Sequence, residues 1–120
     1  MASKTPDYAA IAFKLLEKTN DAKVQWEDNA PFGDFVTALD EGFSFSIRKD
    51  TSRGDTTYSL LMKDKEGNVI FNLRLTDDPE TMISRQSLYE ALGDLYDIAR
   101  RRALRVDEKV ERVSEILEKI

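Results

Sequence analysis

Four arginines form the densest cluster of charge that could bind a ligand: Arg100, Arg101, Arg102 and Arg105. Such a cluster suits phosphate, RNA or an acidic partner. On a helix, with ~100° between residues, the four side chains point in different directions. In addition, Asp97 precedes Arg101 by four residues and Glu108 precedes Arg112 likewise, a spacing that suits surface ion pairs. We interpret the cluster as solvated helix surface. Arg102 alone is expected to point inward. Its charged group would then either reach back to solvent while its aliphatic stem packs on apolar surface, or pair with an acidic group across an interface.

Two acidic residues and an amide, Asp64, Glu66 and Asn68, alternate around Gly67 and suggest a calcium loop. An EF-hand loop places glycine at its sixth position. Here glycine is fourth, so the spacing fails and a hairpin turn explains the segment.

A second acidic group contains Asp77, Asp78 and Glu80. These carboxylates could bind a metal or form an acid–base pair. Because they flank Pro79, we prefer the interpretation that they stabilise the positive end of a helix.

Two further motifs invite a functional reading. Arg53-Gly54-Asp55 is the integrin-binding tripeptide on an expected hairpin loop, but matches of three residues arise by chance. Trp26 could stack on a base or ligand, yet on an alternating strand it is more often a core residue.

The composition excludes several chemistries. The 120 residues contain no Cys and no His, which removes disulfides, thiolate sites and the commonest general base and metal ligand. No glycine-rich phosphate loop or nucleophile elbow is present. We therefore predict no catalytic, cofactor-binding or metal-binding residues, no cofactor, and no enzymatic activity. The net charge of −5 also opposes general binding to nucleic acid.

The elements that position these residues begin with a helix over residues 5–20, started by Thr5, Pro6 and Asp7. Its apolar side chains cover an arc of roughly 200°, wider than an ordinary surface stripe. We therefore expect this helix to contact two neighbours, for instance a sheet and a second helix. Residues 1–4 are expected to form a loose terminus.

About five short strands follow within residues 24–75. The predicted strands are 24–27, 35–39, 43–48, 57–63 and 69–75, and the segments 28–34 and 49–56 are predicted loops. Pairing Met62 with Phe71, Leu60 with Leu73 and Tyr58 with Leu75 places every large apolar residue of the last hairpin on one face.

A helical region closes the chain, over residues 86–120. Ser87 to Glu90 has the form of a capping box, and residues 80–86 are expected to be loop or an irregular turn. Apolar residues keep helical phase from Leu88 to Ile120. The pattern predicts one α+β domain, in which helices cover one face of an antiparallel meander.

Three segments carry a resemblance to a known group of proteins: Leu15–Thr19 with Val24–Glu27, Asp64–Ile70, and Leu88–Asp107. The chain resembles a family of small bacterial proteins of α-β(meander)-α type. The resemblance implies the same architecture and supplies no catalytic residues. Members of that family carry a turn-forming glycine before the Val-Asp pair, where this chain has Arg105, so the resemblance leaves a helix break at that point open.

The last helix suggests self-association. Thirty-three helical residues span about 50 Å, whereas a 120-residue domain is about 35 Å across. Either the helix breaks near Asp107 and folds back over the first helix, or the overhang is buried on another chain. A second candidate patch lies on the outer sheet face. The candidate interface residues are Arg102, Val106, Val110, Val113, Ile116, Leu117 and Ile120 on the helix, with Leu61 and Ile70 on the sheet.

We therefore expect an acidic, cytoplasmic, homodimeric interaction module, since no apolar run approaches the ~20 residues of a membrane span and no signal peptide is evident. One alternative is a chaperone-like or adaptor-like protein that binds a peptide segment of another protein. Another is a small-ligand-binding domain or an enzyme that uses carboxylate or arginine groups.

Overall fold

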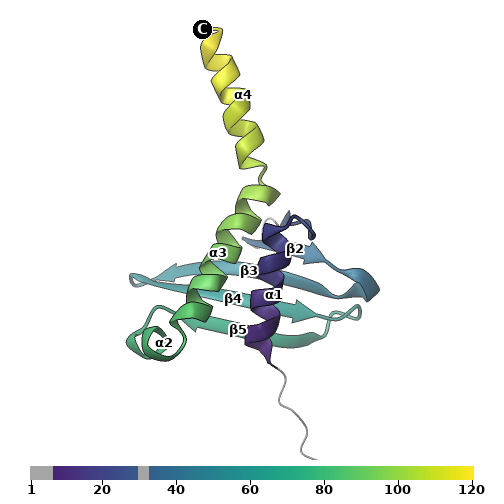
Figure 1. Ribbon diagram of the computed structural model, residues 1–120, viewed down its shortest axis with the longest axis vertical. Helices are drawn as coiled ribbons and strands as arrows, with labels where there is room; N and C mark the ends of the chain where they lie inside the picture. Colours follow the sequence, from purple (N-terminus) through teal and green to yellow (C-terminus); the bar gives the residue numbers. More distant parts are fainter. Residues whose placement is uncertain (1–6, 30–32) are drawn as a thin grey trace, which may run out of the picture.

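A computed structural model describes residues 7–29 and 33–120 of the chain. It contains an antiparallel sheet with two of its helices, α1 and α3, packed on one face (Figure 1). The helices are α1 (Tyr8–Asn20), α2 (Pro79–Ser84), α3 (Gln86–Ala103) and α4 (Val106–Glu118), and a short 3₁₀ turn, η1, covers Asp40–Gly42. The strands are β1 (Glu27–Asn29), β2 (Asp34–Ala38), β3 (Ser44–Ser52), β4 (Asp55–Lys63) and β5 (Val69–Thr76). The α+β class predicted from the sequence is confirmed.

The sheet is a meander in which every strand pairs with its neighbour in sequence, in the order β1-β2-β3-β4-β5. The predicted register of the last hairpin is confirmed: Met62 pairs with Phe71, Leu60 with Leu73 and Tyr58 with Leu75. Period-2 alternation fixes this register because a slip of one residue would turn the apolar side chains to the other face.

The β3–β4 hairpin is longer than predicted. Residues 49–56 were expected to form a loop, but β3 continues to Ser52 and β4 begins at Asp55. Arg53 and Gly54 form the whole connection, and both have positive φ. Two consecutive positive φ angles are typical of the tight turns that match the twist of paired strands. The first strand is also displaced, since β1 covers Glu27–Asn29 rather than 24–27.

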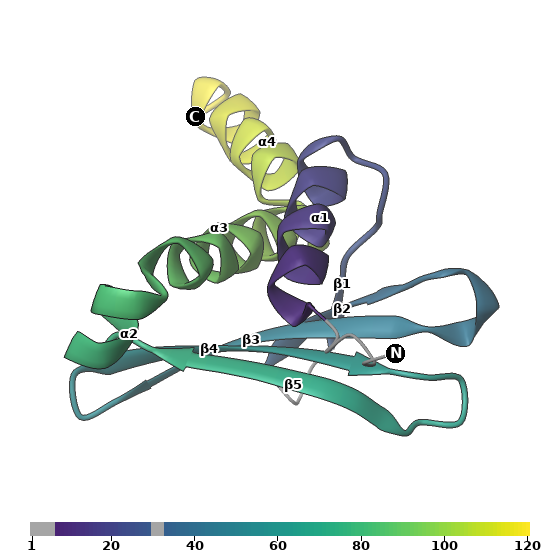
Figure 2. The same cartoon turned by 60° about the horizontal axis from the view of Figure 1, so that its bottom comes forward.

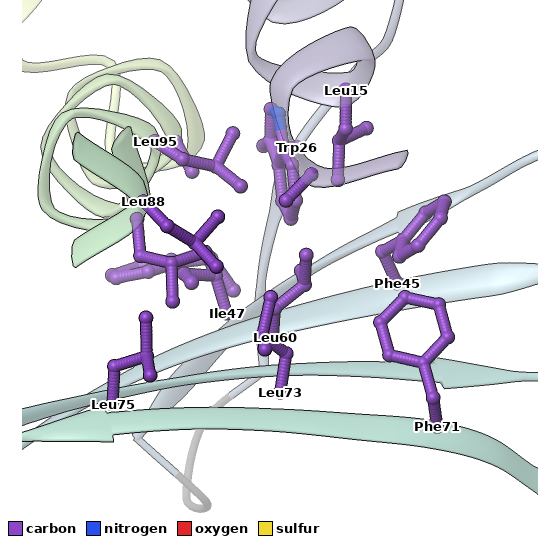
Figure 3. Close-up of a cluster of buried hydrophobic side chains, with 14 residues drawn as sticks. Leu15, Trp26, Phe45, Ile47, Leu60, Phe71, Leu73, Leu75, Leu88 and Leu95 are labelled. Atoms are coloured by element: carbon purple, nitrogen blue, oxygen red, sulfur yellow. The ribbon is translucent and has the colours of Figure 1, made fainter. Parts of the chain in front are cut away.

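The core lies between the helices and the inner face of the sheet (Figures 2 and 3). Ile47 and Leu60 from the sheet and Leu92 and Leu95 from α3 are fully buried. Trp26 is a core residue, as expected, and its indole N–H donates to the Thr19 hydroxyl at 3.1 Å. The buried Trp26 is therefore not available to stack on a base or ligand.

The first helix has two neighbours, as its wide apolar arc predicted. It packs along α3, and the Tyr8 ring stacks on Phe71 of the sheet with a centroid distance of 4.5 Å. Its N-cap is Asp7, whose carboxylate accepts from the Ala10 N–H. The predicted capping by Thr5 and Pro6, like the loose terminus over residues 1–4, lies outside the described residues.

Two predictions about the start of the C-terminal region are wrong. Residues 79–84 form the regular helix α2, capped by Asp78, rather than a loop. The Ser87 capping box does not form, because α3 begins one residue earlier, at Gln86, after Arg85, and that start has no side-chain cap. The Gln86 amide instead donates to Glu90.

Candidate interaction surfaces

The helical region breaks between α3 and α4, and α4 points away from the rest of the molecule (Figures 1 and 2). Leu104 caps α3, and Arg105 then adopts the left-handed conformation with φ 54° and ψ 45°. Neither sequence alternative describes this arrangement fully. The chain does break, two residues before Asp107, but it does not fold back over α1; α4 has no buried residue.

The exposed apolar residues at the C-terminal end form a seam, defined here as Val110, Val113 and Leu117 on α4 together with Ile120, two residues beyond its end. Their spacing of three and four residues is that of the a and d positions of a coiled coil. Ile116 flanks the seam and is 46% exposed, whereas Val106 at the base of α4 is half-buried. The seam residues range from 52% to 93% exposed. Five of the seven predicted helical interface residues therefore lie together on an open surface.

Arg102 has a different environment from the seam. Its guanidinium donates to the backbone carbonyls of Thr19 and Asn20, at the carboxyl end of α1. Both carbonyls belong to the last turn of α1, where the Thr19 carbonyl also accepts from the Ala22 N–H, and a cation there interacts favourably with the helix dipole. Arg102 thus joins the ends of α1 and α3 within one chain, consistent with its predicted inward direction.

Two of the other three arginines of the cluster, Arg101 and Arg105, bind acidic neighbours around the break. Arg101 pairs with Asp107 and Arg105 with Glu108, both at about 3 Å between charged atoms. The predicted partners were different: Asp97 for Arg101, and Glu108 for Arg112, which instead pairs with Glu115. Each predicted pair lies within one helix, α3 or α4, so its spacing is kept; the arginines bind other acidic groups within reach, Asp107 beyond the break for Arg101 and Glu115 for Arg112. All these ion pairs are on the surface, where each contributes little stability.

The outer sheet face is more polar than a typical protein interface core. A hollow of about 330 Å³ on this face is lined mostly by polar and charged residues: Asp34, Ser46, Arg48, Asp50, Ser59, Leu61, Asn72 and Arg74. Leu61 is half-buried and its cross-strand neighbours are Ser46 and Asn72. Ile70 is 46% exposed, beside the bulge of β5. Leu61 and Ile70 therefore do not extend into an apolar patch comparable to the seam.

The acidic motifs of the sequence have structural roles. The Asp64 carboxylate accepts from the backbone N–H groups of Glu66 and Asn68, and these bonds lower its pKa. The Asp78 carboxylate accepts from the Thr81 N–H, which lowers the pKa of Asp78 likewise. Asp77 accepts from the Thr56 N–H. Within residues 7–29 and 33–120, no group of three or more acidic side chains is arranged to hold a metal ion.

The titratable groups with raised pKa are two tyrosines packed between α3 and the sheet. Burial raises the pKa of Tyr58 and of Tyr89, and the Tyr89 hydroxyl donates to the Thr56 carbonyl at 3.1 Å. Their rings contact each other, with centroids 5.3 Å apart. Both phenols therefore have packing roles that account for their pKa shifts.

No helix in the described part of the chain is long and apolar enough to cross a membrane. Comparisons of the chain with protein-family models, with curated proteins and with solved structures gave no match.

Proposed function

We propose that this protein is a non-enzymatic interaction module that self-associates as a homodimer through the seam of α4. The observation that carries the proposal is the exposure of this seam on a helix that has left the body of the molecule. Exposed contiguous apolar surface is costly in water and marks sites of association. A seam with coiled-coil spacing is recognised by another helix or by a groove between elements.

The choice of the helix over the outer sheet face follows from their different polarity. Interface cores are depleted in charged residues. The outer face carries Arg48, Arg74 and Asp34 around Leu61, whereas the four seam residues are all apolar. A second copy is the simplest partner, because closed two-fold dimers are the commonest oligomers and need no other gene product.

The proposal is tested by measuring molar mass with light scattering at several protein concentrations. The wild type is expected to have twice the 13.7 kDa mass of one chain. Val110→Asp and Val113→Asp should be monomeric, since each introduces a charge into the seam. Ile83→Asp is the matched control, because it makes the same kind of change at a residue of α2 that is 87% exposed. A wild type that is monomeric at high concentration overturns the proposal.

A further inference from the structure

An apolar groove of about 260 Å³ lies beside α1. Its floor and walls are apolar side chains from α1, the following linker, the β2–η1 junction and β3: Ile11, Leu15, Val24, Leu39 and Phe45. Lys14 and Lys18 stand on its rim, one helical turn apart. At ~100° per residue, this side of α1 is opposite the side that carries Ala9 and Phe13, which face α2 and the start of α3.

The groove exists because the two helices do not span the strands. Figure 1 shows α3 and α1 side by side across the sheet, which continues past α1 on the side away from α3. Strands β3 and β4 have nine residues each and are therefore about 30 Å long. Two helices packed 8–10 Å apart cover about 20 Å of that length. Because the tip of β3 also extends past α3 at the opposite end, only part of the remaining length lies beside α1.

We propose that α4 of a second copy lies over this groove and inserts the edge of its seam there, so that each copy supplies one helix and one groove. This inference rests on the proposed self-association and names the surface that receives the seam. The groove is too small to enclose a helix, so α4 would lie across its mouth with seam side chains such as Val113 and Leu117 directed into it.

The chain's own α4 cannot reach the groove. Only Leu104 and Arg105 connect α3 to α4, and two residues span at most about 7 Å. The groove lies beyond α1, so the connection would have to pass over a helix about 10 Å wide. An α4 that occupies the groove must therefore come from another molecule.

Charge favours the same pairing. At ~100° per residue, the five acidic residues of α4 fall within an arc about 100° wide, whose nearer end is about 60° from Val110 of the seam: Asp107, Glu118, Glu111, Glu115 and Glu108. Glu111 and Glu118 form no ion pair in the structure as described, nor do Lys14 and Lys18. Five acidic residues against Lys109 and Arg112 give α4 a net charge of −3, so the helix that carries the seam is complementary in charge to an apolar groove with lysines on its rim.

The decisive experiment mixes two variants, each defective in one half of the contact. Val113→Asp damages the seam and keeps the groove, whereas Leu39→Glu places a charge in the groove and keeps the seam. Each is expected to be monomeric alone, with far-UV circular dichroism unchanged. Because one intact seam and one intact groove remain in the mixture, an equimolar mixture should form a heterodimer, detected by sedimentation velocity.

The outcomes separate the two proposals. If Leu39→Glu remains dimeric while Val113→Asp is monomeric, the seam binds elsewhere, for instance to another seam; the inference then fails and the proposed function stands. If neither variant changes a dimeric wild type, both proposals fail. A mixture that stays monomeric also overturns the inference.

A charge reversal supplies a second test that does not alter the core. Lys14→Glu with Lys18→Glu should weaken dimerisation about tenfold, since two rim ion pairs are replaced by repulsion. Adding Glu111→Lys and Glu118→Lys to the same chain should restore it. Lys63→Glu with Lys65→Glu, a matched charge change outside the groove, should have no effect. Failure of the restored variant to recover affinity overturns the inference.

Discussion

Replacing Arg102 with alanine measures whether this residue joins α1 to α3 or serves an intermolecular contact. The variant loses the guanidinium's hydrogen bonds to the carbonyls of Thr19 and Asn20. A hydrogen bond to a charged group contributes about 1.5–3 kcal/mol, and a cation at a helix carboxyl end adds about 0.3–1 kcal/mol. Because Arg102 is largely exposed, and its contact with Asn20 is long at 3.3 Å, we expect a loss near the lower limit, about 1–2 kcal/mol.

The measurement is urea unfolding in the Val113→Asp background, so that dimerisation does not contribute to the apparent stability. For a chain of this length the loss corresponds to a decrease in Tm of roughly 4–8 °C. Arg101→Ala is the matched control, since Arg101 pairs only with the exposed Asp107 and should lose less than about 0.5 kcal/mol. Equal losses for the two variants would refute the capping role. If Arg102→Ala leaves the stability of the monomer unchanged but weakens dimerisation of the chain with an intact seam, Arg102 would instead lie at the interface.

Two further predictions concern single polar groups. The Thr37 hydroxyl is fully buried and has no hydrogen-bond partner among the residues the structure describes, so Thr37→Val should raise the free energy of unfolding by about 1 kcal/mol; a decrease in urea unfolding experiments would contradict this. Asp78 has a pKa below its ordinary value of 3.8 because it accepts from the Thr81 N–H. Its stabilising effect is therefore present above pH 4 and is lost as the pH falls through the lowered pKa. Asp78→Asn should keep the cap and make unfolding less dependent on pH in this range, and an unchanged pH profile would count against the assignment.

The sheet could be predicted best where its strands have one apolar and one polar face. In the β4–β5 hairpin, Leu60 and Leu73 face the helices, and alternation alone fixes both the face and the register. The distal part of β3, from Lys49 to Ser52, extends beyond the core and is exposed on both faces. No alternation marks such a segment, and for that reason it was predicted to be loop.

The candidate site could be predicted in part. The seam is visible in the sequence because its apolar residues recur every three or four positions. The groove is not visible, because Leu39 follows β2, Phe45 lies in β3 and Leu15 in α1, and only tertiary structure brings them together. Lys14 and Lys18 appeared to be ordinary solvated residues for the same reason. Sequence periodicity identifies one partner of a contact more readily than the surface that receives it.

The direction of α4 depends on the single residue Arg105, and a glycine–alanine comparison there tests the break itself. Apolar phase continues through this point, so periodicity alone favoured a continuous helix, whereas Arg105 adopts a left-handed conformation. In that conformation a side chain costs about 1 kcal/mol relative to glycine. In a continuous helix the preference is reversed, because alanine is about 1 kcal/mol more favourable than glycine. Both variants lose the ion pair with Glu108 equally, so their difference isolates the backbone term. We expect Arg105→Gly to be more stable than Arg105→Ala in urea unfolding of the monomeric background. The opposite order would mean that the helix is continuous, and that α4 leaves the body of the molecule as an extension of α3.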